Sequence, residues 1–72
     1  MADNLTKLQD WTRATLAFAE ARRGQARTDY LMGWASKLND DMARLGPDAP
    51  PHLVGLDASD LAKARDRLAA AV

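Results

Sequence analysis

The stretch ARRGQARTDY, residues 21–30, decides how the chain folds, because it separates two segments with helical periodicity. It contains Gly24, the first glycine of the chain, and three arginines around it. The chain either turns here or continues as one long helix. The arginines either occupy a helix end or bind an anion, and the flanking segments bear on both questions.

The segment before Gly24 predicts an amphipathic helix over about residues 3–23, because apolar residues recur there every three or four positions. Asp3 or Asn4 is suited to the N-cap. Arg22 and Arg23 fall in the last turn, where positive charge interacts favourably with the helix dipole. The apolar positions of this segment are Leu5, Leu8, Trp11, Leu16, Phe18 and Ala19.

The segment after Gly24 predicts a second helix over about residues 28–45. Thr28 or Asp29 is suited to its N-cap. Gly46 and Pro47 end it, because glycine adopts the left-handed closing conformation and proline cannot continue a helix. Its apolar stripe consists of Leu31, Trp34, Ala35, Leu38, Met42 and Leu45.

The directions of the two apolar stripes favour a turn at Gly24. At about 100° per residue, the mean directions of the stripes differ by roughly 130°, so one straight helix would bury different faces in its two halves. A turn lets both stripes face one core, which predicts an antiparallel helical hairpin. The uninterrupted helix remains the alternative, because one internal glycine costs only about 1 kcal/mol relative to alanine.

Residues 46–57 read as a proline-containing strap between the hairpin and a third helix. Its second half is apolar, so Leu53, Val54 and Leu56 are expected to lie across the bundle and close one end of the core.

A third, shorter helix is predicted over about residues 58–71, with Asp57 or Ser59 as its N-cap. Its apolar stripe is thin and rich in alanine, so we expect this helix to be the least firmly held. The sequence therefore predicts an all-α fold: residues 1–72 form a single small three-helix domain.

Composition restricts the classes of partner. Ten Lys and Arg balance ten Asp and Glu, which argues against a general polyanion binder. The chain has no cysteine, and it has neither a signal-like N-terminus nor an apolar run long enough to span a bilayer, so we expect a cytoplasmic protein without a membrane partner. Its richness in alanine and arginine suggests a bacterium or phage with GC-rich codons.

Catalysis has little support in the sequence. His52 is the only histidine, and Ser36 and Ser59 are the only serines. Neither serine lies in a nucleophile motif. Residues 39–41 are consecutive, so on a helix their side chains point in different directions and are expected to form a solvated face. We predict no enzymatic activity, no cofactor, no metal site and no small-molecule substrate.

The arginines of the corner allow a nucleic-acid hypothesis. Arg22, Arg23 and Arg27 form the one basic concentration, and helix-turn-helix proteins use a short turn containing glycine. The next helix, however, starts with Asp29 and continues apolar, and an acid at that position repels phosphate. A nucleic-acid regulator that contacts phosphates through Arg22, Arg23 and Arg27 therefore stays a secondary alternative.

The surplus of aromatic residues and methionine carries the stronger functional hint. Trp11 and Trp34 fall on core faces and are suited to filling the bundle. Tyr30, Leu31 and Met32 are consecutive, so they cannot all point inward, and such residue types are enriched at protein interfaces. The candidate protein interface therefore consists of Tyr30, Leu31, Met32, Trp34 and Arg27.

These observations predict a non-catalytic protein–protein interaction module that binds a larger partner or forms a homodimer. A chain of 72 residues hides only about 60% of the surface that its unfolded form exposes, so a partner or second copy would add needed stability. The alternative is a small inhibitor of a host protein complex, encoded by a phage or mobile element, as anti-CRISPR proteins are.

Overall fold

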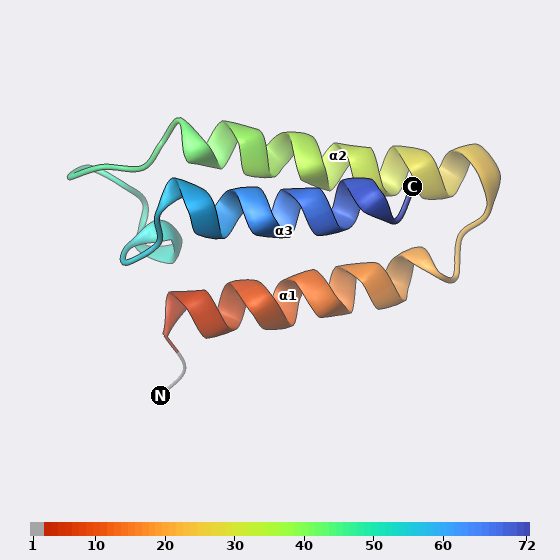
Figure 1. Ribbon diagram of the computed structural model, residues 1–72, viewed down its shortest axis with the longest axis horizontal. Helices are drawn as coiled ribbons and strands as arrows, with labels where there is room; N and C mark the ends of the chain where they lie inside the picture. Colours follow the sequence, from red (N-terminus) through yellow and green to blue (C-terminus); the bar gives the residue numbers. More distant parts are fainter. Residues whose placement is uncertain (1–2) are drawn as a thin grey trace.

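Three α-helices and one 3₁₀ turn make up the regular structure of the computed structural model, which describes residues 3–72. They are α1 (Asn4–Ala19), α2 (Gly24–Met42), η1 (Pro51–Leu53) and α3 (Ala58–Ala70). α2 runs antiparallel to α1, and α3 returns in the direction of α1 (Figure 1). The predicted all-α, three-helix fold is confirmed.

The corner between α1 and α2 lies at Gly24. α1 ends at Ala19 and α2 begins at Gly24, so the alternative of one uninterrupted helix is wrong. Gly24 has a φ of 57°, in the left-handed region that residues with a Cβ atom seldom adopt. The structure thus confirms the turn that the diverging apolar stripes predict.

The helix boundaries at this corner differ from the predicted ones. α1 stops before residue 23, because the chain closes in a turn in which Arg22 N–H donates to the Ala19 carbonyl at 3.0 Å. α2 begins before residue 28, with Arg23 in an extended conformation as its N-cap. Thr28 and Asp29 therefore lie inside the helix. α2 also ends at Met42, before the predicted end at residue 45.

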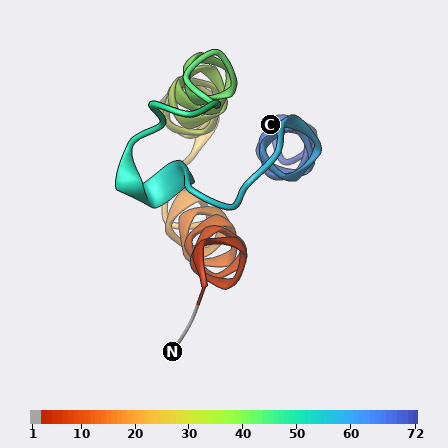
Figure 2. The ribbon, with the colours of Figure 1, turned by 90° about the vertical axis from the view of Figure 1, so that its left-hand side faces the viewer.

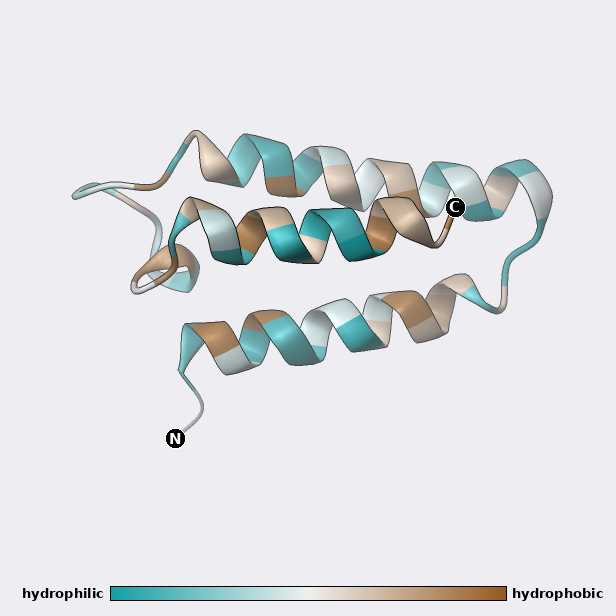
Figure 3. Ribbon diagram, viewed as in Figure 1, coloured by the Kyte–Doolittle hydropathy of each residue, from teal (hydrophilic) through white to brown (hydrophobic). Residues whose placement is uncertain are grey.

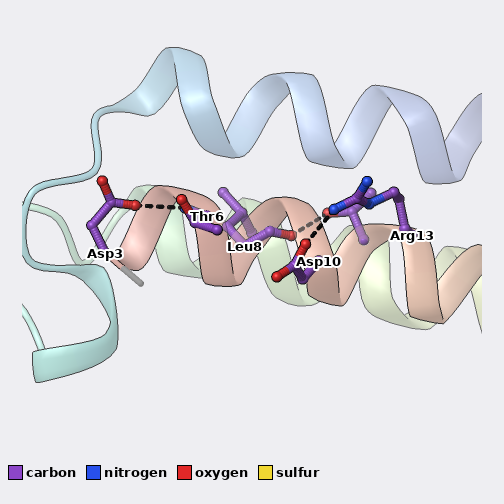
Figure 4. Close-up of polar contacts among 6 residues, drawn as sticks. Asp3, Thr6, Leu8, Asp10 and Arg13 are labelled. Atoms are coloured by element: carbon purple, nitrogen blue, oxygen red, sulfur yellow. Dashed lines mark hydrogen bonds and ion pairs between the residues drawn. The ribbon is translucent and has the colours of Figure 1, made fainter. Parts of the chain in front are cut away.

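Side-chain caps fix the starts of the other two helices. Asp3 Oδ1 accepts a hydrogen bond from Thr6 N–H at 2.8 Å, which makes Asp3 the N-cap of α1 (Figure 4). At α3, Asp57 accepts from Asp60 N–H at 3.0 Å, and the Asp60 carboxylate accepts from Asp57 N–H at 3.1 Å. This reciprocal capping box selects Asp57 over Ser59 as the N-cap.

The core is built mainly from α2 and α3, which form the most closely packed helix pair. α1 adds one buried apolar residue and two buried threonines, Thr12 and Thr15; the Thr12 hydroxyl donates to the Leu8 carbonyl at 2.7 Å. Hydrophobic segments recur along all three helices between polar ones (Figure 3). The buried apolar residues are Ala19, Leu31, Ala35, Leu38, Leu53, Leu61, Ala64 and Leu68.

This packing reverses the expectation that α3 is the least firmly held helix. The alanines Ala35 and Ala64 are buried in the core and let α2 and α3 approach closely, and Arg65 Nη1 donates to Asn39 Oδ1 at 2.8 Å between them. α1 instead brings Leu8 and Leu16, which remain only half-buried. α1 is therefore the more loosely packed helix.

The strap closes one end of the bundle, as predicted, but with fewer residues. Leu53 is buried and Leu56 is half-buried, whereas Val54 is 60% exposed, so its predicted place in the core is wrong. The Asn4 amide donates to the carbonyls of Pro51 at 2.8 Å and Val54 at 2.7 Å, and so ties the strap to the start of α1. Seen end-on, η1 and α3 lie on opposite sides of the line that joins α1 and α2 (Figure 2).

Candidate functional site

A pair of tryptophans lies between α1 and α2. The ring centroids of Trp11 and Trp34 are 5.4 Å apart and their planes meet at 80°, an edge-to-face arrangement that aromatic rings favour. Both side chains are half-buried. Each tryptophan therefore contributes to the core on one side and leaves part of its surface accessible on the other.

An apolar cavity adjoins this pair at the end of the bundle closed by the strap. Its volume is about 270 Å³. Three parts of the chain form its walls, namely α1, α2 and the strap, and one core residue of α3 reaches it. Its apolar lining consists of Leu8, Trp11, Trp34, Leu38, Leu53, Leu56 and Leu61. We call this cavity, together with the Trp11–Trp34 pair and the lysines beside it, the α1/α2 groove.

Polar residues of the lining carry more positive than negative charge. Lys7 and Lys37 are both exposed and border the cavity, as do the Asn4 amide and the exposed His52. Asp41 is the one carboxylate in the lining. The lining of a second cavity, between α1 and α3, also has one more positive than negative side chain, so the α1/α2 groove is set apart by this excess beside a pair of tryptophans.

Asp41 is buried, which corrects the expected solvated face of residues 39–41 at one position, while Asn39 and Asp40 are exposed as expected. Asp41 is only 5% exposed. Its Oδ1 atom lies 3.6 Å from Lys37 Nζ and 3.8 Å from Arg44 Nη1. Both distances exceed hydrogen-bond length, so the carboxylate is balanced by two cations without direct hydrogen bonds. Asp41 therefore offsets part of the local positive charge but leaves Lys7 unpaired among residues 3–72.

The predicted interface residues do not form one surface. Leu31 is 0% exposed and belongs to the core, so its predicted role in an interface is corrected. Met32 is 46% exposed, while Tyr30 is half-buried. Residues two positions apart on a helix point about 160° apart around its axis, so Tyr30 and Met32 lie on different sides of α2. Trp34, one turn after Tyr30, shares the edge that faces α1.

The arginines of the corner between α1 and α2 form mainly intramolecular contacts. The Arg22 guanidinium lies 4.0 Å from the centroid of the Tyr30 ring, and its Nη1 donates to the Phe18 carbonyl at 2.8 Å. Arg27 Nη2 donates to the Ala71 carbonyl at 2.9 Å and so links α2 to the end of α3. Its Nε atom is buried without a hydrogen-bond partner in the described part of the chain. Arg23 is exposed at the start of α2.

Sequence reasoning did not place Lys7, Lys37, Asp41 or, as a surface residue, Trp11 at the α1/α2 groove. Their spacing contained a signal. Lys7 and Trp11 are four residues apart, and Trp34, Lys37 and Asp41 follow one another at three and four residues. Each set forms one strip along its helix, but the sequence does not say that the two strips face each other.

Residues 3–72 contain neither a cluster of metal-ligating side chains nor a membrane-spanning helix. No group of three or more His, Asp or Glu side chains in that range is arranged to hold a metal ion. None of the helices between residues 3 and 72 has the length and apolar character needed to cross a membrane. Comparison of the chain with models of protein families, with curated proteins and with solved structures finds no match.

Proposed function

We propose that the protein is a non-catalytic interaction module that binds a larger protein partner through the α1/α2 groove. The observation that carries this proposal is the Trp11–Trp34 pair, half-buried beside an apolar cavity of about 270 Å³. Tryptophan, with tyrosine and arginine, is enriched among the few residues that contribute most of the binding energy in protein interfaces. Exposed lysines at the same site provide orientation and steering for a partner.

The loose packing of α1 supports the same proposal. Phe18 is 64% exposed, and the exposed Ala14, four residues before it, lies on the same face of α1. α1 thus presents apolar surface to solvent as well as to the core. A partner that covers this surface would add buried area to a domain too small to bury much by itself.

Site-specific crosslinking tests this function. A photoreactive amino acid replaces Lys7, at the α1/α2 groove, or Ala69, an exposed residue of α3 that serves as the matched control. In lysate of the source cells, the Lys7 position is expected to yield a crosslinked product with a larger protein, and the Ala69 position is not. Excess unmodified protein should compete for that product.

The same experiment separates a foreign partner from a second copy. A product of twice the chain mass from the purified protein alone, with a dimer mass by light scattering, would identify the homodimer form of the proposal. Identical products from the two positions, or no product from either, would contradict a function based on the α1/α2 groove.

A further inference from the structure

We propose that the occupant of the α1/α2 groove is an acidic amphipathic α-helix of the partner, which inserts one bulky apolar side chain beside Trp11 and Trp34 and places carboxylates at Lys7 and Lys37. This inference rests on the proposed function and adds to it the chemistry of the partner segment.

The charged side chains around the cavity predict the charge of the partner segment. Lys7 and Lys37 line the cavity, and Asp41 is the only carboxylate among the lining residues. Arg44, outside the lining, lies beside the same carboxylate. Both Lys37 and Arg44 are within 4 Å of that single carboxylate, so neither is fully neutralised by it. Carboxylates of a partner would complement this excess, whereas lysines of a partner would be repelled.

The shape of the site favours a helix. Lys7 and Trp11 on α1, like Trp34, Lys37 and Asp41 on α2, are separated by three or four residues, so the lining runs along both helix axes. A helix laid in such a groove presents anchors with the same spacing. The cavity volume, about 270 Å³, lies just below the roughly 300–1,000 Å³ of sites for drug-sized ligands, and suits one large side chain.

Gly33 supplies an independent reason to expect a close neighbour on this side of α2. Gly24, Gly46 and Gly55 have positive φ angles that explain them, but Gly33 lies inside a helix without one. A Cβ atom added at Gly33 would meet nothing within 4 Å, so no contact inside the molecule requires glycine there. Glycine lowers helix stability relative to alanine, and it is used where another backbone approaches closely.

The position of Gly33 connects it to the α1/α2 groove. It precedes Lys37 by four residues and follows Tyr30 by three, so it is adjacent to both on the surface of α2. A partner helix that starts from the cavity and continues along α2 would pass this point, where the missing side chain lets its backbone come nearer.

Two synthetic peptides test the inference directly. They share one apolar face, with Leu and a single Phe at helical spacing, and they contain no Trp; one carries Glu and the other Lys at all remaining positions. The fluorescence of Trp11 and Trp34, the only tryptophans of the protein, reports binding at the site. The Glu peptide is expected to change the emission and to bind at least about tenfold more tightly than the Lys peptide at low ionic strength. Equal affinities, a preference for the Lys peptide, or no change in emission with either would overturn the inference.

Charge reversal locates the binding site. Lys7→Glu is expected to weaken binding of the Glu peptide about fivefold or more, because it replaces attraction by repulsion. Lys63→Glu on α3 makes the same change of charge next to a different cavity, between α1 and α3, and is expected to leave the affinity unchanged. A loss of affinity with Lys63→Glu but not with Lys7→Glu would contradict the proposed site. Thermal unfolding followed by circular dichroism confirms that both variants fold.

Gly33→Ala separates a docking role from a structural one. The variant is expected to melt at the same or a higher temperature and yet to bind the Glu peptide more weakly. Unchanged affinity would contradict close approach at Gly33. If neither peptide binds but a partner is crosslinked at Lys7, the acidic helix is contradicted and the proposed interaction module is not. If the crosslinking also yields no product, both proposals are contradicted.

Discussion

At the scale of single residues, Trp11 and Trp34 have two roles in one place. Their edge-to-face contact joins α1 to α2, which otherwise touch sparsely, and their outer surfaces line the cavity. Substitution of such a residue can abolish binding either directly or by unfolding the protein. A binding measurement alone does not distinguish the two, so stability must be measured as well.

Trp34→Ala is expected to destabilise the protein by about 1–3 kcal/mol, less than the largest values for buried aromatic residues because the side chain is only half-buried. Urea unfolding followed by circular dichroism measures the change. Trp34→Phe is the control: it keeps an aromatic ring against Trp11 and should cost less than half as much. Equal losses for the two variants would show that the aromatic contact contributes nothing.

Two glycines of α2 are expected to respond to alanine with opposite signs. Gly33 has ordinary helical geometry and open space around it, so Gly33→Ala should raise the free energy of unfolding by about 0.5–1 kcal/mol. Gly24 has a φ of 57°, so Gly24→Ala should lower that free energy by about 1–2 kcal/mol. Denaturant titration of the two variants checks both signs, and a destabilised Gly33→Ala variant would refute the account of Gly33.

At the scale of secondary-structure elements, periodicity predicted the existence of all three helices but not their ends. The corner was predicted correctly at Gly24. This glycine, with its left-handed φ, is however the first residue of α2 and does not close the last turn of α1. The sequence also did not predict that α3 packs more closely against α2 than α1 does. A stripe of alanine such as that of α3 buries little area but permits a close approach to α2.

The sequence contained each strip of the α1/α2 groove without indicating how the strips meet. Residue type predicts a place in an interface for Trp34, whereas exposed lysines such as Lys7 and Lys37 are by residue type ordinary surface residues. What unites them is the register of two antiparallel helices and the position of η1 on the side opposite α3, neither of which is fixed by local spacing (Figure 2).

The N-cap of α1 is expected to respond to acid. Hydrogen bonds from Thr6, chiefly from its backbone N–H, hold the pKa of the Asp3 carboxyl below its ordinary value. Because the folded-state pKa is lowered, the contribution of this cap to stability is complete above the ordinary pKa of Asp and is lost as the pH falls through the lowered value. Helicity of the wild type should therefore show an acid-dependent loss that is smaller in Asp3→Asn, which keeps an oxygen acceptor but does not titrate. The same acid response in both proteins would contradict this assignment.

α1 is expected to open before the other helices. It contributes one residue to the buried apolar set, while α2 and α3 contribute most of the remainder. Native-state hydrogen exchange should show faster exchange for the amides of α1 than for the central amides of α2 and α3. If the proposed partner helix covers α1, its binding should slow exchange in α1 most. Equal protection of the three helices in the free protein would contradict the loose packing of α1.

At the scale of the whole molecule, a neutral chain carries local excesses of positive charge, one of them at the α1/α2 groove. Ten basic and ten acidic residues cancel overall, yet the α1/α2 groove pairs exposed lysines with a tryptophan-lined cavity. The combination suits a partner segment that is apolar at its centre and acidic at its edges, and it gives a small domain a way to gain buried area on binding.

Amide and indole chemical-shift mapping by NMR, with the Glu peptide titrated into the isotope-labelled protein, tests the central claim most directly. The account predicts that the largest shifts cluster at residues 4–11 of α1, residues 33–41 of α2 and the two tryptophan indoles. Shifts that cluster instead on α3 and the opposite side of α1, around Gln9, Lys63 and Arg67, or that scatter over the surface without the indoles, would contradict it.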